Sequence, residues 1–281
     1  MTGSTALAEY LVSGLRRPPL YLSRPPGGPV LVLAPHPDDE VAGCGGAILH
    51  HRQRGDPVTV LYLTDGAASH RRPRPGLVEQ RRREALAGAA LLGLAAGDLI
   101  FWEQPDGRLA VTAELAAELA ALLGRIRPRL IYVPFFLDDH PDHCAAGLLL
   151  AEALAGAPAE AEVWCYEVWA PLLPNRLLNI TAQAAAKFAA LRAHRSQNER
   201  FRLDERIERL NSMRALKVPA PLFSHLEAYA AFSADAYREA AGAIRAMLTQ
   251  AEGATSGGYS VDHAVPATAV PVPDGGPRTG T

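Results

Sequence analysis

The chain alternates between short apolar runs and longer amphipathic segments, and this alternation limits the folds open to it more than any other feature. The runs that predict strands occupy residues 30–34, 58–63, 99–102, 130–135 and 163–168. They are apolar at most positions, which is typical of parallel strands covered by helices on both faces. The segments that predict helices occupy residues 48–54, 77–92, 112–127 and 144–155, and most stop at a glycine or before a proline. The pattern predicts an α/β fold with a Rossmann-like, mostly parallel sheet flanked by helices.

The two ends of the chain lie outside this alternation. Residues 1–29 begin with a short helical pattern and then become proline-rich, so we expect an N-terminal arm laid over the surface. Residues 30–250 are expected to form a single α/β domain, with a helical C-terminal region after Thr181. Residues 251–281 are rich in Gly, Pro, Thr and Ser, and we expect a disordered tail there.

Composition narrows the classes of partner. The chain has 281 residues and a formal net charge of −2, so nothing favours a polyanion such as nucleic acid. Its three cysteines are odd in number and widely spaced, which suits a reducing compartment better than a disulfide framework. No run approaches the roughly 18 apolar residues of a membrane span, and no secretory signal pattern precedes the first strand. We therefore expect a cytoplasmic protein.

Clusters of acidic residues and histidines follow two of the predicted strands. Residues 35–40 read Pro-His-Pro-Asp-Asp-Glu, and residues 138–143 read Asp-Asp-His-Pro-Asp-His. In open α/β sheets, ligands bind outside the carboxyl ends of the strands, where both clusters would lie. Zinc in hydrolases typically takes three protein ligands from His, Asp and Glu and leaves a fourth position for water. The two clusters together predict a mononuclear metal site built from two strand ends.

Spacing suggests roles for six side chains in the clusters. His36 and Asp39 are three residues apart and can reach one ion together, and His143 would complete the ligand set. Asp38 would then lie next to the metal as the general base for water. His140 would be free to donate to an oxyanion, with Asp142 holding its tautomer.

Each of these patterns also has an alternative interpretation without a metal site. Asp38 or Asp39 alone would be an ordinary helix N-cap. Residues 43–46, Gly-Cys-Gly-Gly, could cradle a phosphate, although they depart from the G-x-G-x-x-G spacing. Cys44 and Cys144 lie near the clusters, but their small neighbours favour buried packing over metal ligation. Two matched clusters at equivalent positions favour the metal site over these separate readings.

The motifs extend to a family resemblance. Residues 34–40 and 140–143 resemble the paired motifs of the PIG-L/LmbE-like zinc-dependent N-deacetylase family. Further matches over roughly residues 28–230 are Thr64-Asp65-Gly66, Arg81-x-x-Glu84 with Leu92-Gly93, and Lys187 with residues 193–197. The resemblance implies a Rossmann-like hydrolase with one zinc per chain that removes the acetyl group from N-acetylated amino sugars such as GlcNAc conjugates.

Carried over by motif, the resemblance implies a role for seven residues. His36, Asp39 and His143 would bind zinc, Asp38 would be the general base, His140 with Asp142 would support the oxyanion, and Arg81 would contact sugar hydroxyls, with Arg82 and Arg83 as adjacent alternatives. Two further residues stay open: Asp65 either lines the site or caps a turn, and His194 is either structural or a neighbour of the site.

Three functions are compatible with these residues. The first is the zinc-dependent N-deacetylase, an amidohydrolase. The second is a metal-dependent hydrolase of another acyl amide or an ester, because a metal site does not choose the leaving group. The third is a sugar- or nucleotide-binding module without catalysis, which the complete set of ligands, base and oxyanion donor disfavours. The sequence does not determine the aglycone of the substrate. It also leaves the oligomeric state open, so the chain could be a monomer or a homo-oligomer.

Overall fold

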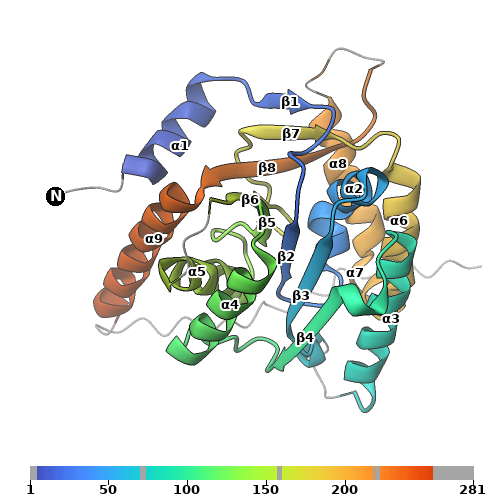
Figure 1. The fold of residues 1–281 in the computed structure, drawn as a ribbon, viewed down its shortest axis with the longest axis horizontal. Helices are drawn as coiled ribbons and strands as arrows, with labels where there is room; N and C mark the ends of the chain where they lie inside the picture. Colours follow the sequence, from blue (N-terminus) through green and yellow to red (C-terminus); the bar gives the residue numbers. More distant parts are fainter. Residues whose placement is uncertain (1–4, 70–73, 157–159, 217, 219–221, 256–281) are drawn as a thin grey trace, which may run out of the picture. The chain divides into compact units, whose positions relative to one another are not determined.

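One eight-stranded sheet organises the protein, with strand order β1-β7-β8-β6-β5-β2-β3-β4 (Figure 1). Strand β8 pairs antiparallel with β6 and β7, and the other neighbours are parallel. The strands are β1 (Leu20–Leu22), β2 (Val30–Ala34), β3 (Val58–Thr64), β4 (Leu99–Gln104), β5 (Leu130–Pro134), β6 (Glu162–Tyr166), β7 (Arg176–Asn179) and β8 (Leu226–Ser233). The predicted α/β fold with a mostly parallel sheet is confirmed.

The computed structural model describes residues 5–69, 74–156, 160–216, 218 and 222–255. Its α-helices are α1 (Thr5–Arg16), α2 (Asp39–Arg54), α3 (Leu77–Leu91), α4 (Ala113–Ile126), α5 (Pro141–Gly156), α6 (Ala184–Ala193), α7 (Arg195–Phe201), α8 (Leu203–Ala215) and α9 (Ala234–Thr255). Contacts between residues divide the chain into two compact units, Met1–Ala246 and Met247–Thr281. The sheet belongs to the first unit. No helix among these residues is both long and apolar enough to cross a membrane.

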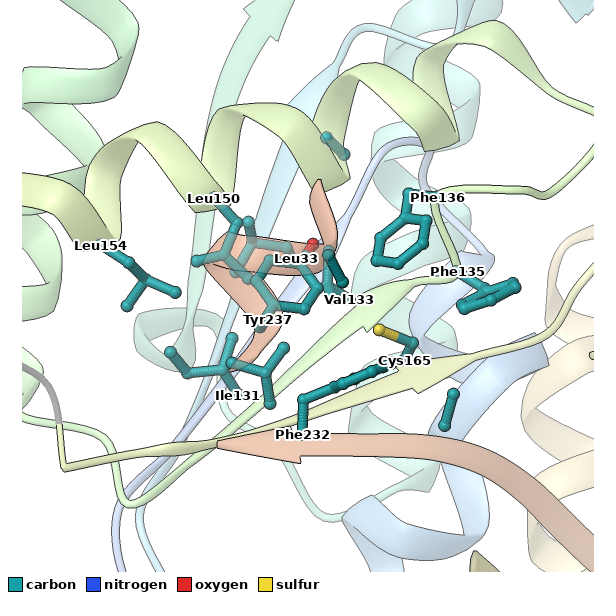
Figure 2. Close-up of a cluster of buried hydrophobic side chains, with 14 of the residues drawn as sticks. Leu33, Ile131, Val133, Phe135, Phe136, Leu150, Leu154, Cys165, Phe232 and Tyr237 are labelled. Carbon is teal, nitrogen blue, oxygen red and sulfur yellow. The ribbon is translucent and has the colours of Figure 1, made fainter. Parts of the chain in front are cut away.

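Helices cover both faces of the sheet. Helices α1, α4, α5 and α9 lie on one face, and α2, α3, α6, α7 and α8 lie on the other (Figure 1). Successive residues of β2 enter the two cores in turn, since Leu31 and Leu33 belong to one buried cluster and Val32 to the other. Figure 2 shows the first cluster, which includes Leu33 of β2 and Tyr237 of α9. Burial on both faces explains why the strand sequences lack polar alternation.

The N-terminal arm is part of the domain, contrary to expectation. Its helix α1 buries Leu7 and Tyr10 in the core, and its strand β1 extends the sheet by pairing with β7. Residues 1–29 therefore continue the domain rather than lie over its surface. At the other end, α9 continues to Thr255, past the predicted start of the tail at residue 251. Residues 256–281 lie outside the described part of the chain.

Strands β7 and β8 were not predicted from the sequence. The segment after Thr181 does contain α6, α7 and α8, as the helical pattern suggested. Strand β8, however, has the sequence Leu-Glu-Ala-Tyr-Ala-Ala-Phe-Ser, whose alanines do not favour a strand by propensity. It becomes a strand because it is buried between β6 and β7, where packing outweighs propensity.

The position of β2 places the functional clusters together. Strands β2 and β5 are parallel neighbours, with Val30 opposite Leu130 and Val32 opposite Tyr132. Strand β3 lies on the other side of β2, so the chain order reverses between β2 and β5. Such a switch point opens a crevice at the carboxyl ends of the strands, which is the usual ligand site in folds of this class.

Candidate metal centre and pocket

A cavity of about 310 Å³ opens at this switch point. Its walls come from the loops after β2, β3, β4 and β5, from α3 and from the α7 region. The lining residues are His36, Asp38, Asp39, Ala68, Ser69, Arg81, Asp106, Gly107, His140, Trp169, Gln197 and Phe201. The lining is therefore rich in carboxylates and imidazoles, and it also includes two aromatic rings, Trp169 and Phe201, whose centroids are 5.6 Å apart.

The first acidic cluster forms the turn that starts α2. Asp38 has φ 148°, a backbone conformation that residues other than glycine rarely adopt. Its N–H donates to Glu40 Oε2 at 3.1 Å, and its carbonyl accepts from the N–H groups of Val41 and Ala42. Strained backbone of this kind persists only where neighbours hold it, and it is frequent at functional sites. The turn points Asp38 into the pocket while Asp39 begins the helix.

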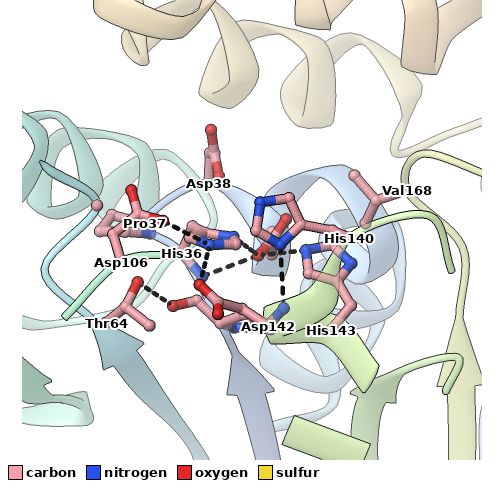
Figure 3. A network of polar contacts seen from close by, with 12 residues as sticks. His36, Pro37, Asp38, Thr64, Asp106, His140, Asp142, His143 and Val168 are labelled. Atoms are coloured by element: carbon pink, nitrogen blue, oxygen red, sulfur yellow. Dashed lines mark hydrogen bonds and ion pairs between the residues drawn. The ribbon is translucent and has the colours of Figure 1, made fainter. Parts of the chain in front are cut away.

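Three of the predicted residues converge on one carboxylate oxygen. Asp39 Oδ2 lies 3.1 Å from His36 Nδ1 and 3.2 Å from His143 Nε2, and it also accepts the N–H of His36 at 2.8 Å. All three side chains are nearly or fully buried. Figure 3 shows His36, from the loop after β2, and His143, from the first turn of α5, in the same cluster, and their ring centroids are 5.4 Å apart. The structure thus brings together the residues expected to be ligands.

The unpaired ring nitrogens of His143 indicate that the group of His36, Asp39 and His143 suits a cation. His143 is completely buried, yet neither of its ring nitrogens has a hydrogen-bond partner of good geometry among the described residues. Buried polar atoms are normally paired, so an unpaired imidazole beside a carboxylate points to a ligand that completes it. Two imidazoles and one carboxylate are also a common donor set for zinc in hydrolases. Two groupings among the described residues have their ligand atoms within 4.8 Å of one another: His36 with His140 and His143, and His36 with Asp106, His140 and Asp142.

Charges around His36 hold it firmly. Its Nε2 lies 3.1 Å from both Asp106 Oδ1 and Asp142 Oδ2. Burial alone would lower the pKa of His36, but hydrogen bonds to Asp106, Asp142 and Asp39 hold that pKa well above its ordinary value. Each ring nitrogen of His36 therefore faces a carboxylate, which fixes the orientation of the ring.

Asp142 reaches His140 through its backbone and not through its carboxylate. Its carboxylate does not contact His140 but accepts from the N–H groups of Gly107 (2.7 Å) and Leu109 (3.0 Å), and contacts His36. What reaches His140 is the Asp142 backbone, whose N–H donates to His140 Nδ1 at 3.2 Å. Burial, with His36 and His143 nearby, lowers the pKa of His140 to about 4. His140 is therefore neutral, and because Nδ1 accepts, its proton lies on Nε2.

Asp38 and Arg81 form a buried pair beside the centre. Arg81 Nη2 lies 3.2 Å from Asp38 Oδ2 and also donates to the Pro37 carbonyl at 3.0 Å. Nη1 donates to the Gly66 carbonyl, and Nε has no partner among the described residues. Burial raises the pKa of Asp38 to about 7, against the lowering effect of Arg81. A carboxyl with a pKa near neutrality can both accept and return a proton.

The sequence left the roles of Asp65 and His194 open, and the structure indicates one role for each. Asp65 is a cap, because its Oδ1 accepts the N–H groups of Ala67 and Asp106 and holds the turns that follow β3 and β4. His194 is fully buried behind the turn that carries Asp38, and burial lowers its pKa to about 3, so it is neutral. Neither residue lines the pocket.

Helix α2 has a kink that depends on a buried ion pair. Cys44 has non-helical dihedral angles, and the N–H groups of Gly46 and Ala47 donate to the Glu227 carboxylate at 2.7 and 2.9 Å. Lys187 Nζ bonds Glu227 Oε1 at 2.8 Å and the Ala42 carbonyl at 2.8 Å. The pair thus satisfies groups on both sides of the break. It fixes the direction of the short first segment, which carries the acidic cluster.

Several functional side chains were not singled out from the sequence. Asp106, Asp138 and Glu40 each contact the centre or its turn, and Trp169 and Phe201 line the pocket. Asp106 had a usable signal, because it lies four residues after the end of the predicted strand 99–102, in a Pro-Asp-Gly turn. The aromatic pair had none, since Trp169 and Phe201 come from segments that meet only in the folded protein.

Comparisons with known proteins agree with this arrangement. Residues 31–154 match the family model PIG-L, described as GlcNAc-PI de-N-acetylase. The chain is 29% identical over 183 residues to a probable N-acetyl-alpha-D-glucosaminyl L-malate deacetylase 2 of Bacillus anthracis, covering 60% of this chain and 80% of that protein. It is 28% identical over 187 residues to diacetylchitobiose deacetylase of Thermococcus kodakarensis, covering 60% and 69%. A crystal structure of a conserved protein from Thermus thermophilus superposes with a TM-score of 0.61 at 30% identity, covering 71% of this chain and 92% of that one.

Proposed function

Because the chain belongs to the PIG-L family of de-N-acetylases, we propose that it hydrolyses the acetamide of an N-acetylated amino sugar conjugate to a free amine and acetate. The observation that carries this proposal is the convergence of His36, Asp39 and His143 at the wall of a pocket that also presents Asp38. That arrangement places a metal donor set and an acid–base group on one substrate-sized cavity.

In this proposal, His36, Asp39 and His143 hold one zinc ion per chain. When bound, zinc supplies a Lewis acid that polarises the acetyl carbonyl and lowers the pKa of water. The Nε2 atom of His143, which faces Asp39, and the buried carboxylate of Asp39 supply donors for it. Asp142 and Asp106 act on the far nitrogen of His36 and keep the ring in place.

Asp38 acts as the general base. It lines the pocket beside the donor set, and the strained turn together with Arg81 fixes its position. It accepts the proton of the attacking water as the new C–O bond forms. The protonated carboxyl then gives the proton to the nitrogen as the C–N bond breaks, so that the amine leaves neutral. A pKa of about 7 suits both directions of transfer.

His140 stabilises the negative charge on the former carbonyl oxygen. Its Nδ1 is occupied by the N–H of Asp142, so Nε2–H is the donor left for the pocket. A neutral donor that is already oriented needs no reorganisation as the oxyanion develops. Arg81 lines the same pocket, and we assign it contact with the sugar hydroxyls.

The experiment that tests the function is acetate release from a panel of N-acetylated sugars. Zinc-loaded protein is incubated with free GlcNAc, diacetylchitobiose, a GlcNAc malate conjugate and a simple alkyl GlcNAc glycoside, and acetate is followed by proton NMR. We expect release of one acetate per free amine from at least one of them. If zinc-loaded protein releases no acetate from the panel but hydrolyses a propionyl amide or an acetyl ester, the acyl assignment is wrong.

A further inference from the structure

Asp138 has no role in the mechanism so far, yet it is one of the most enclosed carboxylates near the centre. It lies on the loop after β5, and its side chain is fully shielded from solvent. The two oxygens of Asp138 face different parts of the site. One faces His143, and the other faces the loop that follows β6 and carries Trp169.

The Oδ2 atom of Asp138 holds the aromatic wall of the pocket. It accepts the backbone N–H groups of Val168 (3.3 Å), Trp169 (3.0 Å) and Ala170 (3.4 Å). Figure 3 places Val168 of this loop beside His140 and His143. Three successive amides around one oxygen give a loop a defined position. Trp169, the residue in the middle, lines the pocket.

The Oδ1 atom of Asp138 acts on His143. It lies 3.4 Å from His143 Nδ1, and neither atom has another partner among the described residues. Oδ1 is an acceptor, so the stable arrangement has the His143 proton on Nδ1. Nε2, which faces Asp39 Oδ2 at 3.2 Å, is then the nitrogen available as a ligand. Carboxylates that hold the far nitrogen of a metal-binding histidine in this way fix both its tautomer and its orientation.

We propose that Asp138 is a positioning residue that keeps Nε2 of His143 free for the metal and, with its second oxygen, anchors the Trp169 wall of the pocket. The inference rests on the metal site of the proposed function. It goes beyond that function because one carboxylate links the metal centre to the substrate wall.

The test is the affinity of metal-free protein for Zn²⁺ after Asp138→Asn. The asparagine oxygen can accept the three amides, which leaves its NH₂ group facing His143 Nδ1. The NH₂ group can donate only to an unprotonated Nδ1 of His143. The imidazole proton then lies on Nε2, where it prevents this atom from binding the metal. We expect the Kd for Zn²⁺, measured by competition with a chromophoric chelator, to rise roughly 10- to 100-fold.

Asp139→Asn is the matched control, because Asp139 is the next residue and is exposed. It should leave the Kd unchanged. The melting temperature of metal-free Asp138→Asn should stay close to that of the wild type, since the loop anchor is kept, which separates the effect from a loss of folding. Asp138→Ala removes both contacts, and we expect weaker Zn²⁺ binding together with altered tryptophan fluorescence.

An unchanged Kd for Zn²⁺ in Asp138→Asn would overturn the proposal. So would an equal rise in Kd for Asp139→Asn, because that would reflect surface charge alone. These readouts do not depend on turnover. A failure of the deacetylase assay would therefore contradict the proposed function and leave the role of Asp138 to be judged by metal affinity.

Discussion

Asp38→Asn is expected to lower kcat by at least about 100-fold, the usual contribution of a positioned acid–base group, while zinc stays bound. Asparagine preserves the shape of the side chain and tolerates positive φ better than most residues, so the strained turn should survive. What is lost is the ability to accept a proton. The measurement combines the initial rate of acetate release with the zinc content of the same sample.

The pH dependence of the rate is the control for this assignment. Asp38 must be ionised to act as a base, and its pKa is about 7 in the metal-free protein. A bound cation would lower that pKa below its value in the metal-free protein. We therefore expect kcat/KM to fall as the pH drops, with a midpoint at or below 7. The acid limb should disappear in Asp38→Asn. A zinc-loaded variant that turns over at nearly the wild-type rate would show that another group is the base.

Lys187→Met is expected to reduce the free energy of unfolding by about 3–5 kcal/mol, because it leaves a buried carboxylate without its cation. Lys187 and Glu227 are both fully buried, and Nζ also bonds the side chain of Asn211 at 2.9 Å. Methionine fills a similar volume but cannot compensate the charge. Urea unfolding of the metal-free variant and wild type, followed by circular dichroism, measures the difference.

Two further variants test whether charge is the cause. Lys187→Met combined with Glu227→Gln removes both charges, and we expect it to regain part of the lost stability because the amide oxygen still accepts one N–H of the α2 kink. Arg209→Met breaks an exposed pair with Glu205 and should change the free energy of unfolding by less than about 1 kcal/mol. If Lys187→Met lowers the free energy of unfolding no more than Arg209→Met does, the result would contradict the role given to the buried ion pair at the α2 kink.

The sequence was sufficient to predict that the two clusters meet. Apolar strands, helix stops and parallel connections place residues 35–40 and 138–143 at one edge of the sheet, and the structure has them on the neighbouring strands β2 and β5. This prediction works because it depends only on the periodicity and order of the elements. The side-chain types at these positions then limit the chemistry to metal and acid–base work.

Contacts that depend on strand order outside this core could not be predicted. Strand β8 enters the sheet antiparallel between β6 and β7, and only that insertion carries Glu227 to the α2 kink. Asp142 was expected to hold the tautomer of His140, and its backbone N–H donates to His140 Nδ1, but the turn at Gly107 and Leu109 offers its carboxylate two amides and turns it toward His36. In both cases the partner lies on a distant segment whose place is set by tertiary packing.

The measurement that tests the account most directly is a zinc titration of the metal-free protein with acetate release as the readout. The His36, Asp39 and His143 site predicts no activity without metal and a linear rise that stops at one zinc per chain. Activity that is complete before zinc is added, or no acetate from any N-acetylated sugar with one zinc bound, would contradict it.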